Sequence, residues 1–139
     1  MGLVVPNAGA IRLLARTLSS FTPGPNDLAL RLFKNDYTPD AASVLADFQE
    51  ATFGGYFRQW IDSAGWPTPT IVGGKASSTY SLDPFTWTVT DPGQTVYGYY
   101  VEEAATATVL WAERLATPRV LFPGGQLELT LILTGKSAA

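Results

Sequence analysis

Tight-turn sequences recur at short intervals in the second half of the chain, and they limit the segments between them to short strands. The turns are Asp-Pro at 83–84, Asp-Pro-Gly at 91–93 and Pro-Gly-Gly at 123–125. The segments between them are rich in Val, Thr and aromatic residues, which favour strands over helices. We therefore expect strands at 79–82, 85–90, 96–102, 108–114 and 126–134.

The first half of the chain adds two strands and one ambiguous segment. Leu28, Leu30 and Leu32 alternate with other residues, which predicts a half-buried strand over 28–34. A second strand is expected over 56–61, and a loop over 35–40. Residues 41–50 fit either one helical turn or a loop that places Phe48 in the core. About seven or eight strands at this spacing predict a mainly β fold, a single antiparallel β-sandwich of the jelly-roll or immunoglobulin-like kind.

One short helix precedes the strands. Asn7 can cap a helix over 8–18, in which the apolar side chains share one face and the two arginines lie on another. The apolar residues are Ile11, Leu14 and Leu18, and the arginines are Arg12 and Arg16. The simpler interpretation is a helix whose apolar face closes one side of the core. The alternative is an arm that docks onto a neighbouring subunit.

Prolines and a glycine at 23–25 end the helix and suggest how the chain is divided. Residues 1–20 form an N-terminal arm and helix, and residues 21–139 form the β-sandwich domain. A chain of 139 residues is long enough to bury one core without disulfides or metals. We expect both parts to belong to one folding unit.

Histidine and cysteine are both absent, which excludes whole classes of chemistry. No Ser-His-Asp triad, thiolate nucleophile, zinc–cysteine site or disulfide can form. A net charge of −3 with scattered basic residues does not favour binding to nucleic acid. No apolar run approaches the ~18 residues of a membrane span, and no signal peptide is visible. We expect no enzymatic activity, no cofactor and no membrane partner.

The acidic residues give little reason to expect an active site. Glu102 and Glu103 are adjacent, so in a strand they point to opposite faces, and we interpret them as a solvated strand end. Glu113 is expected to pair with Arg119 or Arg58 in a structural salt bridge. The loop acids lack the residue order of a calcium loop, so no metal site is expected there. These loop acids are Asp36, Asp40 and Asp47.

A glycine pair and the tryptophans complete the candidate features. The sequence Gly-Gly-Lys at 73–75 lacks the other residues of a phosphate-binding loop, and we interpret it as a turn. Trp87 and Trp111 lie inside predicted strands, so we place them in the core. Trp60 and Trp66 lie near loop sequence and are the better candidates for exposure, where aromatic side chains bind sugars or subunits.

Five segments together resemble small structural proteins of tailed bacteriophages and prophages, including capsid decoration or cement proteins. The resemblance runs over most of the chain, and the segments are 5–9, 28–39, 48–56, 96–101 and 110–114. It implies a virion component, most specifically a decoration protein that bridges major capsid subunits. It also implies a homotrimer at local three-fold axes, located on the capsid surface after assembly in the host cytoplasm.

The expected partners are therefore the major capsid protein and copies of this chain. The expected contact regions are residues 1–20 and 57–67. Within them, the candidate interface residues are Val5, Pro6, Ile11, Phe57, Trp60 and Trp66.

Three other functions stay open at this point. A receptor- or glycan-binding module of a tail or head fibre would use exposed Trp60, Trp66 or Tyr100. A head–tail connector or tail-completion protein would share the structural role but occupy another place in the virion. A carboxylate-based glycosidase or lyase would require two acids that converge in a cleft.

Overall fold

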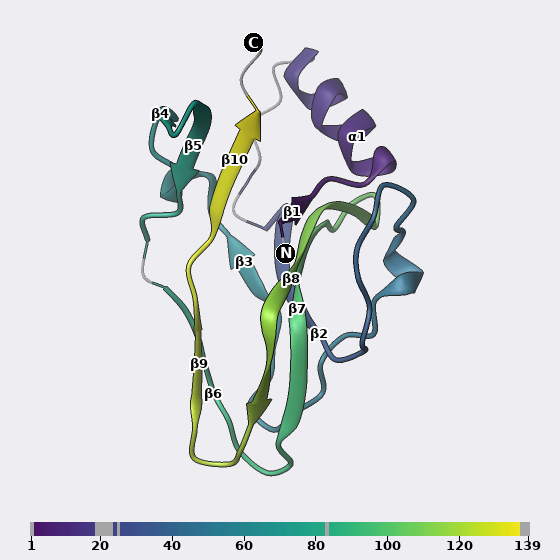
Figure 1. The fold of residues 1–139 in the computed structure, drawn as a ribbon, viewed down its shortest axis with the longest axis vertical. Helices are drawn as coiled ribbons and strands as arrows, with labels where there is room; N and C mark the ends of the chain where they lie inside the picture. Colours follow the sequence, from purple (N-terminus) through teal and green to yellow (C-terminus); the bar gives the residue numbers. More distant parts are fainter. Residues whose placement is uncertain (1, 19–23, 25, 83, 137–139) are drawn as a thin grey trace.

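The computed structural model describes residues 2–18, 24, 26–82 and 84–136. Residues 1, 19 and 20 of the predicted N-terminal arm lie outside this description. The described residues form one α-helix, two short 3-10 turns (η1, η2) and ten strands, arranged as in Figure 1. The elements are β1 (Leu3–Val4), α1 (Asn7–Leu18), β2 (Leu28–Phe33), η1 (Leu45–Asp47), β3 (Gln59–Ile61), η2 (Ser63–Gly65), β4 (Thr70–Val72), β5 (Lys75–Thr79), β6 (Phe85–Thr88), β7 (Gln94–Glu103), β8 (Thr108–Leu121), β9 (Gln126–Leu129) and β10 (Ile132–Lys136).

The strands form two layers. One layer is a five-stranded sheet in the order β1-β8-β7-β2-β3. The other layer combines a three-stranded sheet, β10-β5-β4, with the two-stranded pair β6-β9. Neighbouring strands in all three sheets run antiparallel. This confirms the predicted fold class, a mainly β, sandwich-like fold with one short N-terminal helix.

The main core lies between the two layers. Leu30 and Leu32 of β2 face Trp87 of β6 and Leu127 of β9 across the sandwich. Each of these side chains is almost completely buried. Burial of this much apolar surface is the largest favourable contribution to folding. Trp111 of β8 also belongs to this core, so both tryptophans predicted to be internal are confirmed there.

The outer side of β2 carries a second cluster, which the sequence interpretation missed. Phe33 projects away from the main core, and the loop after β2 folds back over it. Phe48 from this loop stacks on Tyr100 of β7 at a ring distance of 4.7 Å. The strand is therefore buried on both faces rather than half-buried. Residues 41–50 were predicted to form either one helical turn or a loop that buries Phe48, and both features are present. The single turn η1 is followed directly by Phe48, which packs in this second cluster.

Several strand boundaries differ from prediction. The prediction of a strand over 79–82 is wrong, because the strand in this region is β5, which ends at Thr79. The expected strand at 56–61 shrinks to β3, and β1 and β4 were not predicted. The segment 126–134 divides into β9 and β10, because the chain leaves β6 and joins β5 at Leu131. Short strands are the hardest to predict, since pairing partners decide them more than propensity does.

The β4–β5 hairpin confirms the turn predicted at 73–75. Gly73 and Gly74 have φ values of 59° and 78°. A two-residue turn with positive φ at both positions matches the twist of the flanking strands, and glycine adopts it without steric cost. The hairpin projects from the same end of the molecule as α1 (Figure 1).

Helix α1 packs against β8 at this end of the sandwich. Gly9 allows the close approach, since a Cβ at this position would lie 2.4 Å from the carbonyl oxygen of Val109. The helix begins at Asn7 itself, because the Pro6 carbonyl already accepts a hydrogen bond from the Ala10 amide at 2.8 Å. That the helix and the sandwich form one folding unit stays a prediction.

Candidate assembly surface

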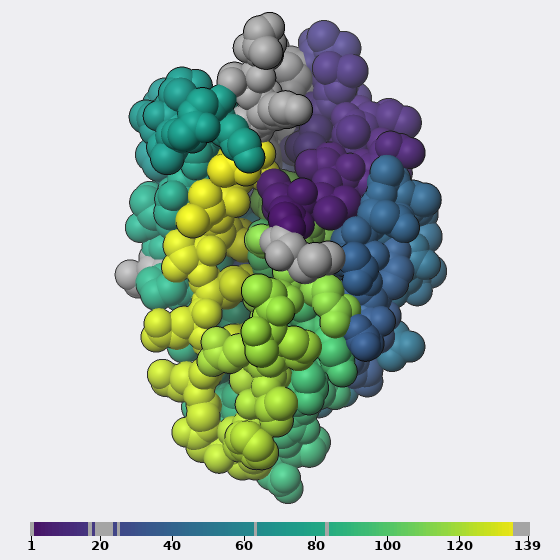
Figure 2. Space-filling view, in the orientation of Figure 1, coloured from purple at the N-terminus to yellow at the C-terminus, as the bar shows by residue number. Residues whose placement is uncertain are grey.

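Helix α1 is turned the opposite way from the prediction. The three apolar residues that were predicted to face the core point into solvent, with Ile11 72%, Leu14 60% and Leu18 77% exposed. The buried face is instead formed by Gly9, Arg12, Leu13 and Arg16, which recur at the same helical spacing. The interpretation of α1 as a helix that closes the core with Ile11, Leu14 and Leu18 is therefore wrong. Figure 2 shows the helix, in purple, at the upper right end of the molecule.

A buried carboxylate explains this orientation. Glu103, the last residue of β7, is completely buried, so the prediction of a solvated strand end is wrong. Arg12 donates from Nε to Glu103 Oε1 at 2.5 Å, and Arg16 donates to Oε2. The Thr106 hydroxyl also donates to Oε1, at 2.5 Å. Because a buried charge must be paired, the arginines are held inward and the apolar face turns out.

The ion pairs also set the charge state of Glu103. Burial alone would raise its pKa, but the hydrogen bonds from Thr106, Arg12 and Arg16 outweigh that effect. The pKa of Glu103 is therefore lower than usual. A general acid in catalysis needs the opposite shift. We name the Glu103, Arg12 and Arg16 side chains the helix anchor.

Glu102 belongs to a separate ion cluster on the outer face of the sheet. Its Oε2 lies 3.3 Å from Arg31 Nε, and Arg31 also binds both carboxylate oxygens of Glu50, at 2.7 and 2.8 Å. Burial alone would lower the pKa of Arg31, but the hydrogen bond and charge of Glu50 and the charge of Glu102 raise it. Glu102 and Glu103 thus point to opposite faces as predicted, although both are buried.

The other predicted ion pairs are arranged differently. Glu113 accepts a hydrogen bond from the Tyr99 hydroxyl at 3.0 Å, so its expected pairing with Arg119 or Arg58 is wrong. Burial, together with the Glu113 charge, raises the pKa of Tyr99, which keeps the phenol protonated. Arg114 binds Asp36 at 2.6 Å.

The remaining loop acids stabilise turns. Asp40 accepts a hydrogen bond from the Ala42 amide, and Asp47 accepts one from the Val44 amide, each at 2.9 Å. Among the described residues, no group of three or more acidic, histidine or cysteine side chains is placed to hold a metal ion.

The six candidate interface residues differ in their exposure. Ile11 lies on the exposed face of α1, and Val5 and Phe57 are also exposed. Pro6 is completely buried, so it is not available to a partner in this structure.

Trp60 and Trp66 are half-buried. The Arg58 guanidinium lies over the Trp60 ring, 4.7 Å from its centroid. Trp66 packs edge-on against the core residues Tyr80 and Trp111, with ring distances of 5.2 and 6.4 Å.

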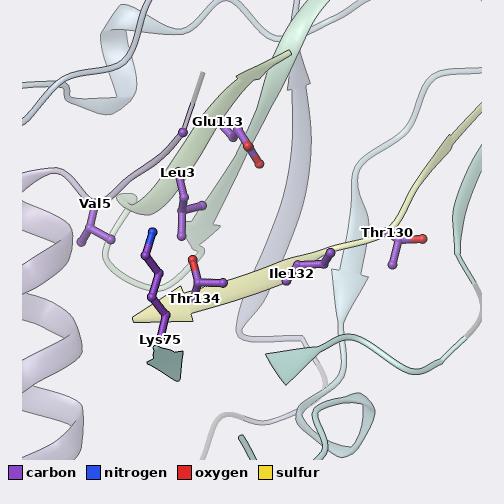
Figure 3. A pocket seen from close by; sticks show the side chains of 8 residues that line it. Leu3, Val5, Lys75, Glu113, Thr130, Ile132 and Thr134 are labelled. Atoms are coloured by element: carbon purple, nitrogen blue, oxygen red, sulfur yellow. The ribbon is translucent and has the colours of Figure 1, made fainter. Parts of the chain in front are cut away.

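An open groove of about 650 Å³ separates the edges of the two layers, between β1 and β10. In Figure 3, Leu3 lies above Thr134 and Lys75, which come from β10 and β5. The Tyr80 amide donates a hydrogen bond to the Leu131 carbonyl. Residues that bond to the neighbouring strand alternate with residues that do not in an antiparallel pair, so the N–H and C=O groups of Ile132 and Thr134 point away from β5. Of the described lining residues, one is acidic and one is basic, Glu113 and Lys75. This composition does not suit a metal or a catalytic acid pair.

Comparison with known proteins does not add an assignment. No protein-family model matches the chain, and no curated protein matches it. In the part of the chain that the structure describes, no helix has both the length and the apolar character that crossing a bilayer requires. The arrangement of α1 is therefore the main indication of function.

Sequence reasoning missed the helix anchor for an identifiable reason. Arg12 and Arg16 are spaced four residues apart on a short helix, and Glu103 lies 87 residues beyond Arg16 in the chain. The spacing of the arginines was a usable signal, because two cations on one helical face can share one carboxylate. Nothing in the sequence identified Glu103 as that carboxylate.

Proposed function

We propose that this chain is a non-enzymatic structural protein of a bacteriophage virion, a capsid decoration protein that bridges major capsid subunits and stabilises the head. The observation that supports an assembling, structural role best is the uncharged apolar face of α1, which points into solvent while the helix anchor holds it in place. An apolar face of this kind contributes stability only when another surface covers it. The sequence resemblance supplies the virion setting.

The state of the acidic residues supports a non-enzymatic role. Glu103 is occupied by two arginines and a threonine, and Glu102 and Glu50 share Arg31. A glycosidase or lyase would need two acids that converge on a substrate, with one of them kept protonated. The two carboxylates that contact Arg31 are instead both engaged with a cation.

The proposed partners are the major capsid protein and further copies of this chain, assembled as a trimer at local three-fold axes. A closed ring of identical contacts suits a capsid lattice, because each copy then presents the same surface to equivalent subunits. No nucleic acid or membrane takes part, and the place of action is the capsid surface.

The test is the mass of the purified protein in solution, followed by sedimentation with empty capsids of the source phage. We expect a trimer that sediments with capsids at a fixed ratio to the major capsid protein. Capsids already saturated with unlabelled protein serve as the control for non-specific pelleting. Protein that stays in the supernatant contradicts the decoration role.

A fibre-associated glycan-binding module has less support from the geometry. Tyr100 is buried beneath Phe48, so it cannot stack on a sugar. Trp66 is partly covered by Tyr80 and Trp111, and the Trp60 ring lies against Arg58. Binding to tail fractions or to glycans in the absence of capsid binding would favour the tail and fibre alternatives.

A further inference from the structure

The exposed residues of α1 follow the spacing of a helix–helix seam. Ile11, Leu14 and Leu18 are separated by three and then four residues, which are the a, d and a positions of a heptad. A strict stripe of this kind is narrower than the apolar face with which a helix usually covers a sheet. Its spacing matches the ridges of another helix.

Helix α1 itself carries no charge along this stripe. Arg12 and Arg16 are the two charged residues of α1, and both side chains are directed to Glu103. Small exposed residues lie beside the stripe, namely Ala8, Ala10 and Ala15, and exposed Asn7 occupies the d position before Ile11. When a surface meets its own copy, every charge faces a like charge near the symmetry axis. The helix anchor removes this repulsion from α1.

We propose that α1 docks against α1 of a second copy of this chain, with Ile11, Leu14 and Leu18 forming the seam. This inference rests on the proposed structural role and names the surface that joins one copy to another. The small alanines beside the seam let the two helix backbones approach closely. The capsid contact then belongs to other surfaces of the molecule.

The anchor prepares the helix for this contact. An isolated helix of 12 residues is marginally stable in water. Here Gly9 sits against the β8 backbone and Glu103 binds both arginines, so α1 is already formed before a partner arrives. The conformational entropy of the helix is therefore lost during folding and not during association. More of the favourable free energy of the contact then contributes to binding.

The seam alone is small, so it does not account for a whole interface. A 12-residue helix is about 18 Å long, and stable interfaces bury roughly 1,200–2,000 Å² in total. The Asn7 amide donates to the Ala41 carbonyl at 2.8 Å, which places the loop after β2 beside the start of α1. Val44 of this loop is also exposed. Pairing through α1 should therefore depend on protein concentration.

The absence of cysteine allows a direct test by engineered disulfides. Leu14 lies at the middle of the seam, and copies related by a three-fold axis hold it at the same height, so it meets its counterpart there. Leu14→Cys should form covalent dimers under mild oxidation, because a disulfide requires Cα atoms within about 7 Å. The matched control is Ile71→Cys on β4, which is 67% exposed and lies outside the seam. It should give no dimer above the level of random collision.

A second pair of variants tests the contact without a cross-link. Leu14→Glu should lose the oligomer in a mass measurement, while its melting temperature stays close to that of the parent, since Leu14 is largely exposed. Ile71→Glu should keep the oligomer. An oligomer that persists in Leu14→Glu, or equal cross-linking of both cysteine variants, overturns the inference.

These outcomes separate the inference from the proposed function. Copies that cross-link through Leu14→Cys but do not sediment with capsids uphold the α1 contact and contradict capsid decoration. Copies that sediment with capsids but do not cross-link through Leu14→Cys contradict the α1 contact alone.

Discussion

Replacing Glu103 by Gln tests the helix anchor most directly. The substitution keeps the shape of the side chain but removes its negative charge from a fully buried site. Arg12 and Arg16 then lose their common counter-ion, and Thr106 loses a charged acceptor. The free energy of unfolding should fall, because the buried guanidinium groups lose the carboxylate charge that offsets their burial.

The magnitude follows from the exposure of the two arginines. Breaking a buried ion pair from one side costs about 3–5 kcal/mol. The Arg12 side chain is 36% exposed and can turn toward water, whereas the Arg16 side chain is 9% exposed and cannot. We therefore expect the lower end of the range, about 3 kcal/mol. With a urea m-value of about 2 kcal/mol/M, the midpoint falls by about 1.5 M.

The assay is urea unfolding followed by tryptophan fluorescence, with Glu128→Gln as the control at an exposed acid on β9. The control should shift stability by less than about 0.5 kcal/mol. A double-mutant cycle with Arg16→Met should give a coupling energy of about 1–3 kcal/mol. A loss below about 0.5 kcal/mol in Glu103→Gln, with no coupling to Arg16, would refute the anchor.

Four further predictions concern the helix contact, pH, the aromatic loop and metals. Gly9→Ala should cost about 1–3 kcal/mol in urea unfolding, because the new Cβ meets a carbonyl oxygen, whereas Gly2→Ala enters open space and should be neutral. The folded pKa of Glu103 is lowered, so its stabilisation is complete above its unfolded pKa of about 4.5 and is lost as the pH falls below that value; acid titration of Glu103→Gln should show a flatter profile. Trp66→Ala should lower the melting temperature, at a cost of about 2–3 kcal/mol, and leave the oligomer mass unchanged; a lost oligomer with normal stability would instead make Trp66 an interface residue. A chelator should leave the melting temperature unchanged, and a large drop would indicate a bound metal.

The sequence was most informative where local chemistry decides the structure. The glycines at 73 and 74 predicted a turn, and they form it with positive φ values. Alternation predicted β2, and turn residues separated the strands of the second half. These features depend on neighbours in the chain, so one sequence is enough to read them.

The sequence was least informative where distant segments meet. Whether 126–134 is one strand or two depends on β5 and β6, which are separate partners of β10 and β9. The burial of both faces of β2 depends on the loop that brings in Phe48. Neither partner can be read from the strand itself, because sheet pairing is set by tertiary context.

The sequence by itself therefore determined the fold class, the presence of the N-terminal helix and the absence of histidine and cysteine chemistry. Only the tertiary structure decided which face of that helix is buried. The apolar stripe of α1 predicted Ile11, Leu14 and Leu18 inside, but the end of β7 places Glu103 where the helix docks. A buried carboxylate is too costly to leave unpaired, so it selects the arginine face and turns the apolar face to solvent.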